Sequence, residues 1–299
     1  MYHLAAVFPF LRRIRIPLNR DQLMLLMLAL NELLLGFETY SAHIISGTIV
    51  PREWIPILFG PVAGLALIAF GFFALRGKRL ALLITYAAFL ASIIVGLLGG
   101  YYHILRSAMP WAPAGEKVSA LLFIWGPPLL APFTFALVGV LGIITVWTES
   151  PVDSGKLVLF GGLKVSLPLS KTRAYILLIG AGCLATLLSG VMDHARTNFT
   201  NYWLWLPTVV GVFTSVVAIS LGMIERPSRF DLTTYTAAML LMIITGILGT
   251  YLHYGHDLTS QGTLVLERFI RGAPLLAPLL YADMGSLGLI ALFDPVGRD

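Results

Sequence analysis

Charged residues are scarce in this sequence. Only 12% of its 299 residues are Asp, Glu, Lys or Arg, which is about half the share of ~25% found in soluble globular domains. The mean hydropathy is +0.86, and 58% of the residues are hydrophobic. This composition excludes a soluble domain and predicts an integral membrane protein that is embedded in the lipid bilayer.

Several classes of chemistry are excluded by motifs that the chain lacks. It has one cysteine, Cys183, so it forms no intrachain disulfide. It contains no Walker-type loop, dinucleotide fingerprint, CxxCH haem-attachment motif, HExxH metal motif or nucleophile elbow. Because the Walker-type loop is missing, the chain is not expected to hydrolyse ATP by itself. It also has no basic patch with interleaved aromatic residues that would suggest a nucleic acid as partner.

Long apolar runs are what the sequence does contain. Each run is long enough to cross about 30 Å of hydrocarbon, which takes roughly 20 helical residues. The predicted spans are residues 22–47, 55–75, 80–103, 118–147, 174–195, 204–224, 232–254 and 269–293. The sequence therefore predicts an all-α membrane protein with eight transmembrane helices.

The positive charges predict how these spans are oriented. With both termini on one side, that side holds fourteen Lys and Arg residues and the other side holds six. Cytoplasmic loops carry the excess of Lys and Arg. We therefore expect a multi-pass protein of the cell (inner) membrane with both termini cytoplasmic. The basic segment 1–21 is expected to lie along the cytoplasmic membrane surface.

An internal repeat divides the spans into two equal groups. "HIISGTIVPREWIPILFG" (43–60) aligns with "HARTNFTNYWLWLPTVVG" (194–211) at an offset of 151 residues. "GLLGGYYH" aligns with "GILGTYLH" at an offset of 150, and "FIWGPPLLAP" with "FIRGAPLLAP" at an offset of 146. Three ordered matches predict a tandem repeat of two four-helix units, 22–147 and 174–294. Because each unit has an even number of spans, both units enter the membrane in the same direction.

The segment 148–173 links the two units on the cytoplasmic side. Short alternating runs, "KLVLF" and "LKVSL", flank Gly161 and Gly162. Such runs joined by two glycines are typical of a β-hairpin. An irregular linker is the alternative.

Four histidines recur at the outer ends of odd-numbered spans: His43, His103, His194 and His253. The first and third helices of a four-helix unit are diagonal neighbours, so their side chains can meet in the bundle core. Two imidazoles at one level can ligate the two axial positions of a haem b iron. The alternative is that each histidine makes a structural hydrogen bond at the membrane interface. Glycines before them, such as Gly96, Gly99, Gly246 and Gly249, permit either close helix packing or the approach of a macrocycle.

A transition metal ion is the other cofactor that these histidines can bind. The second unit adds Asp193 and His256 to the four histidines. His253 and His256 are three residues apart and share a helix face if the helix extends that far. The set of candidate metal ligands is therefore His43, His103, His194, His253, His256 and Asp193.

Acidic residues inside the spans form a third candidate group. Glu32 and Asp283 lie near the middle of the first and eighth spans, and their repeat equivalents are Cys183 and Leu137. Intramembrane acids are rare and face a partner or a cavity. Glu32, Glu38 and His43 suggest a proton path toward the outer side. The alternative is that the acids are protonated and hydrogen-bonded to neighbouring helices.

The layout of eight spans, a tandem duplication and four outward-side histidines is similar to that of haem A synthases. The similarity concerns arrangement only, because those enzymes place their histidines on even-numbered spans, and only Glu38 before His43 matches their Glu–His pairing. The sequence therefore assigns no family.

Three functions remain open from the sequence. The first is a b-type haem-binding electron-transfer or oxidoreductase subunit that works with quinol or with other membrane or outer-side redox subunits. The second is a carrier or channel for a metal ion or protons. The third is a non-catalytic membrane subunit of a larger complex. The sequence leaves open whether the chain is an enzyme.

Overall fold

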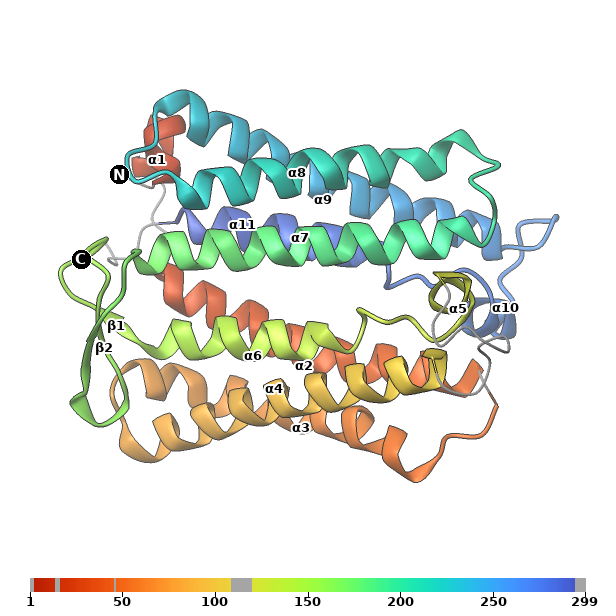
Figure 1. Cartoon of the computed structure of the whole chain (residues 1–299), viewed down its shortest axis with the longest axis horizontal. Helices are drawn as coiled ribbons and strands as arrows, with labels where there is room; N and C mark the ends of the chain where they lie inside the picture. The colour runs from red at the N-terminus through yellow and green to blue at the C-terminus, as the bar shows by residue number, and fades with distance from the viewer. Residues whose placement is uncertain (1–2, 14–16, 46, 109–119, 294–299) are drawn as a thin grey trace.

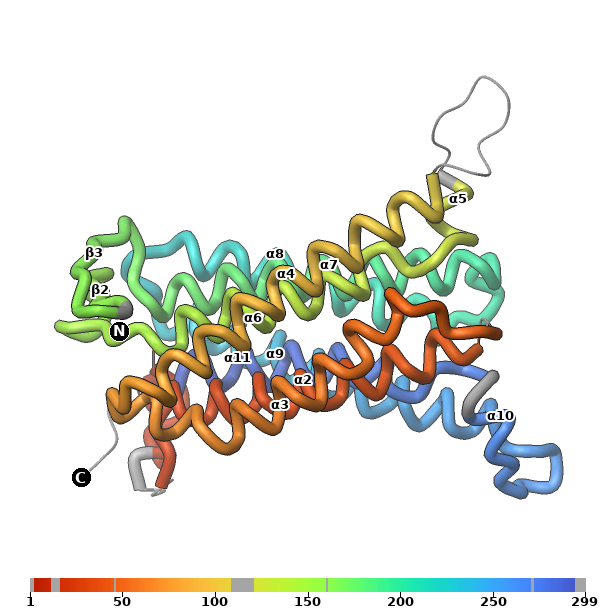
Figure 2. The backbone as a smooth tube through the Cα atoms, turned by 90° about the horizontal axis from the view of Figure 1, so that it is seen from below, coloured from red at the N-terminus to blue at the C-terminus, as the bar shows by residue number. Residues whose placement is uncertain are grey.

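The structure of the chain is a computed structural model that describes residues 3–13, 17–45, 47–108 and 120–293. Its helices lie side by side along one long axis, and the strands gather at one end of this bundle (Figure 1). The short helices α5 and α10 lie at the opposite end (Figures 1 and 2). The molecule therefore has a strand end and an α5/α10 end, and we use these names below.

Six helices within the described residues are long and apolar enough to cross a membrane. They cover six of the predicted spans and support a multi-pass membrane protein. Their bounds are α2 Arg20–Ile45, α3 Trp54–Leu75, α4 Arg79–Ala108, α7 Lys171–Ala195, α8 Trp205–Met223 and α9 Arg229–Asp257. The short 3-10 helices η2 Pro51–Glu53 and η4 Tyr202–Leu204 lead into α3 and α8.

The fourth and eighth predicted spans differ from the others because each is broken. The short helix α5 Ala120–Trp125 is followed by the stretch 126–132 and then by α6 Phe133–Val146. In the same way α10 Leu266–Arg271 is followed by the stretch 272–278 and then by α11 Leu279–Ala291. Proline lacks an amide hydrogen and clashes with the preceding turn, so the helices resume only after Pro132 and Pro278.

The helices pack in the same order in the two halves of the chain. In the first half α2 packs on α3, α3 on α4, α4 on α6, and α6 back on α2. In the second half the ring runs α7, α8, α9, α11 and back to α7. Two helices on opposite sides of such a ring are diagonal neighbours, so α2 faces α4 across the first bundle and α7 faces α9 across the second.

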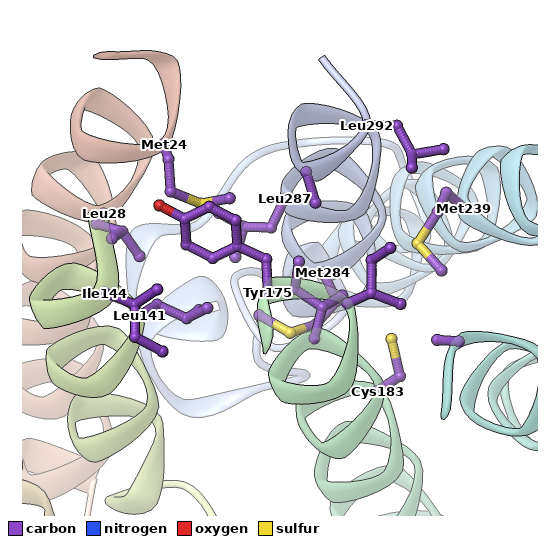
Figure 3. Close-up of a cluster of buried hydrophobic side chains, with 14 of the residues drawn as sticks. Met24, Leu28, Leu141, Ile144, Tyr175, Cys183, Met239, Met284, Leu287 and Leu292 are labelled. Carbon is purple, nitrogen blue, oxygen red and sulfur yellow. The ribbon is translucent and has the colours of Figure 1, made fainter. Parts of the chain in front are cut away.

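The two bundles meet through α2 with α11 and α6 with α7. Apolar side chains from these helices form the buried core, part of which is drawn in Figure 3. Tyr175 and Cys183 on α7 are both fully buried there. The core therefore includes the junction between the two bundles.

A small sheet lies between the two halves at the strand end. It has three strands, β1 Thr148–Glu149, β2 Lys156–Val158 and β3 Lys164–Ser166, in the order β1-β2-β3 with antiparallel pairing. Between β2 and β3 the chain passes through η3 Phe160–Gly162, where Gly161 and Gly162 both have positive φ. Glycine adopts this conformation without the steric cost that other residues meet.

The N-terminal segment begins with α1 Leu4–Val7 and η1 Pro9–Arg13. The amide of Leu4 donates to the carbonyl of Leu292, 2.7 Å away, just after α11. The first and last described elements therefore meet at the strand end. Residues 1, 2 and 14–16 of the predicted surface segment 1–21 lie outside the described residues.

Candidate functional site

His43 and His103 meet across the diagonal of the first bundle. His43 lies in the last turn of α2, and His103 lies near the end of α4. Their ring centroids are 6.2 Å apart, and the ring planes are inclined by 59°. Both side chains are half-buried. The structure thus brings together the first pair of histidines that the repeat indicates.

Each ring of this pair is oriented by a backbone carbonyl. Nδ1 of His43 lies 2.7 Å from the carbonyl oxygen of Thr39, one turn earlier in α2. Nδ1 of His103 lies 2.8 Å from the carbonyl oxygen of Pro128 in the break between α5 and α6. A carbonyl oxygen only accepts, so Nδ1 carries the hydrogen in both rings. In the neutral tautomer Nε2 then holds the lone pair, which is the arrangement found in metal-ligating histidines.

The second pair is arranged differently. Nδ1 of His253 lies 2.9 Å from the carbonyl oxygen of Pro274 in the break before α11, as His103 does with Pro128. His194, by contrast, has the ring of Phe199 edge-on at 6.1 Å and 81°. Within the described residues no ring contact joins His194 to His253. The second pair therefore shares one anchoring bond with the first pair but not its ring contact.

The glycines before the histidines serve close helix packing. A Cβ atom on Gly99 would lie 2.7 Å from the Cβ atom of Pro132, and one on Gly249 would lie 2.8 Å from the Cβ atom of Pro278. Gly96 and Gly246 face Ala136 and Ala282 in the same way. The starts of α6 and α11 therefore pack against these four glycines.

The residues added for a metal site have other partners. His256 is largely exposed, and its Nδ1 lies 3.2 Å from Oδ1 of the buried Asp257. That oxygen also accepts from the amide of Ala273, 2.9 Å away, so Asp257 holds the break before α11. Asp193 lies 3.6 Å from Arg196. In the part of the chain that the structure describes, no three His, Cys, Asp or Glu side chains are grouped to hold a metal ion.

The two intramembrane acids each have a hydrogen-bond partner. Oε1 of the fully buried Glu32 lies 2.5 Å from Oγ of Ser92 on α4. Oδ2 of Asp283 accepts from Nδ2 of Asn31, 2.9 Å away, across the junction of the bundles. Glu38 is half-buried and makes no hydrogen bond within the described residues. A continuous path through Glu32, Glu38 and Asp283 remains a prediction.

Ser92 is a site residue that the sequence reading missed. A constant spacing could have indicated it, because His43 and His103 are sixty residues apart and so are Glu32 and Ser92. The helices α2 and α4 run in the same direction, so residues with this spacing lie at the same level. The spacing of sixty residues becomes informative only once the contact of His43 with His103 is known.

No protein-family model, curated protein or solved structure matches the chain. The evidence for its function therefore lies in its own side chains.

Proposed function

We propose that the chain is a membrane-embedded electron-transfer subunit that binds one b-type haem between His43 and His103. The observation that carries this proposal is the separation of 6.2 Å between the two ring centroids. A metal–imidazole bond is about 2 Å long, so one iron would be held by both rings only if the rings lie within a few ångströms of each other at one level. His43 and His103 meet this requirement.

The donor chemistry of the pair also fits haem iron. Both rings hold their Nδ1 hydrogen on a carbonyl, which fixes the ring orientation and leaves Nε2 as the basic nitrogen. A haem b held in this way supplies one-electron transfer. The residues of this chain provide the two ligands and, through Thr39 and Pro128, the bonds that orient them.

We propose a single haem because only the first pair has this arrangement. The ring contact of His194 is with Phe199, and within the described residues no ring contact joins it to His253, so we assign His253 a structural role at the break before α11. A single haem near one face does not carry electrons across the bilayer alone. We therefore propose a redox partner on the outer side, which is either quinol or another redox subunit of a larger complex.

We also propose that the two bundles are copies of one duplicated unit of four membrane-crossing segments, of which α5–α6 and α10–α11 are the broken ones. The matching order of helix packing and the three sequence matches support this proposal. The excess of fourteen over six positive residues supports an inner-membrane protein whose strand end and both termini face the cytoplasm.

The test is a reduced-minus-oxidised visible spectrum of the detergent-purified protein and of four single variants. We expect about one haem per chain in the wild type, and loss of the haem in His43→Ala and His103→Ala. His253→Ala and His194→Ala are the matched controls and are expected to keep it. His253→Ala is a matched control for His103→Ala, because both histidines make the same kind of Nδ1–carbonyl hydrogen bond and the proposal assigns haem to only one of them.

Two outcomes overturn the proposal. A colourless wild type excludes haem and leaves a metal-ion or proton carrier, or a non-catalytic subunit of a complex, as the function. Loss of haem in all four variants alike means that the histidines act on the fold and not as ligands. Metal analysis of the same preparations separates the metal-ion carrier from the non-catalytic subunit.

A further inference from the structure

The carboxyl group of Glu32 lies in the core of the first bundle, with none of its surface exposed. The neighbouring helices α3 and α6 carry no titratable side chain in their sequences. On α4 the residue that contacts Glu32 is Ser92, and the charged residues Arg79 and Arg106 lie toward the two ends of that helix. On α11 the acid is Asp283, which is bonded to Asn31. No cation therefore faces Glu32 from these described helices.

The hydroxyl of Ser92 makes two short contacts, but it has only one hydrogen to donate. Its Oγ lies 2.5 Å from Oε1 of Glu32 and 2.7 Å from the carbonyl oxygen of Phe135. A serine hydroxyl has one hydrogen, and the carbonyl of Phe135 can only accept. If Ser92 donates to Phe135, the second short contact requires a hydrogen on the carboxyl of Glu32.

The other carboxyl oxygen leads to the same conclusion. Oε2 of Glu32 is buried and has no hydrogen-bond partner among the described residues. A charged oxygen in this position would lose its hydration without compensation, whereas a neutral carbonyl oxygen loses much less. A hydrogen on Oε1 therefore satisfies Ser92 and leaves Oε2 as the neutral oxygen.

We infer that Glu32 is a proton-binding site in the core of the first bundle, where its carboxylic acid holds an exchangeable proton and donates it to Oγ of Ser92. Ser92 in turn donates to the carbonyl of Phe135, which forms a chain of two hydrogen bonds from α2 through α4 to α6. The ligand of this site is an exchangeable proton.

This site is separate from the histidine pair. Glu32 and His43 are eleven residues apart on α2, a rise of about 16 Å, and the same spacing separates Ser92 from His103 on α4. Gly36 and Gly96 lie between the two levels, and their open sides are filled by Pro61 and Ala136. The proton-binding role therefore does not depend on a haem and can be tested without one.

Infrared difference spectroscopy of the full-length protein tests the inference. The spectrum of wild type minus Glu32→Gln should contain the C=O stretching band of a protonated carboxyl and no carboxylate bands. Transfer to D2O should lower the frequency of that band, because the proton exchanges. Ser92→Ala should raise its frequency, because the hydrogen bond to Ser92 is lost, while Asp283→Asn should leave it in place.

Labelling the wild type with glutamate that carries heavy carbon at the carboxyl makes the test independent of how the variants fold. The same band should then shift in the unaltered protein. Carboxylate bands in place of the protonated band would show an ionised Glu32 and overturn the inference. A protonated-carboxyl band whose frequency does not change in D2O would show that the proton does not exchange, which also overturns the inference. Both results are read from the same spectra whether or not the haem proposal holds.

Discussion

Lys171 and Asp21 form an ion pair across the two halves of the molecule, with Nζ 2.7 Å from Oδ2. Only 1% of the Lys171 side chain is exposed, whereas 23% of Asp21 is. Nζ also donates to the carbonyls of Thr145 and Trp147, at 3.0 and 2.7 Å. All three donor positions of the ammonium are therefore used, and α7 of the second bundle is tied to α2 and α6 of the first.

Removing the acid of this pair should weaken the junction between the bundles. We expect Asp21→Asn to lower the free energy of unfolding by about 2 kcal/mol, the range of a hydrogen bond to a charged group, because Lys171 stays buried without its counter-ion. The double variant with Lys171→Met should be more stable than Asp21→Asn alone, since it removes the unpaired charge. Unfolding of the single and double variants in a detergent or urea series measures these free energies. If the double variant loses the sum of the two single losses, the residues do not interact and the expectation is contradicted.

The packing of α4 on the start of α6 leaves no room for a methyl group at Gly99. A Cβ there would lie 2.7 Å from the Cβ of Pro132, so we expect Gly99→Ala to cost about 1–3 kcal/mol through overpacking. Gly255→Ala on α9 is the control, because nothing lies within 4 Å of its Cβ position, and alanine should leave stability unchanged or raise it. Equal unfolding midpoints for both variants would contradict the packing described for Gly99.

Arg196 links the second bundle to the broken helix of the first. Its Nε and Nη2 donate to the carbonyls of Ile124 and Gly126, at 2.6 and 3.0 Å. We expect Arg196→Ala to speed amide hydrogen exchange in α5, because the end of that helix loses its partners. Exchange in α10 should not change, since Arg196 makes no bond there within the described residues. Faster exchange in both helices would point to general loosening and contradict a local tie.

Asn31 and Asp283 form a polar contact between the bundles. The residues at the matching positions of the proposed repeat, Gly182 and Leu137, form an apolar one. We expect Asp283→Leu alone to cost about 1–3 kcal/mol, because Asn31 is left buried without a partner. Adding Asn31→Gly should recover part of this loss by copying the contact of Leu137 with Gly182. Unfolding measurements on both variants check this, and a double variant less stable than the single one would rule it out.

The apolar runs were enough to predict the long helices from the sequence. A segment that crosses a bilayer has to satisfy its backbone internally and be apolar over about 20 residues, and both conditions are local. The runs at 80–103 and 232–254 accordingly match α4 and α9 closely. The breaks at 126–132 and 272–278 were harder to predict, because proline shows where a helix is interrupted but not where it resumes.

The sequence by itself determined that the chain belongs in a membrane, where its long helices lie and which histidines recur, since these follow from composition and spacing. Only the tertiary structure decided what those histidines contact. His103 contacts His43, sixty positions away, and the carbonyl of Pro128, while the ring contact of His194 is with Phe199. Such contacts depend on how the helices pack and where the backbone breaks, and both are set by residues distant in the chain.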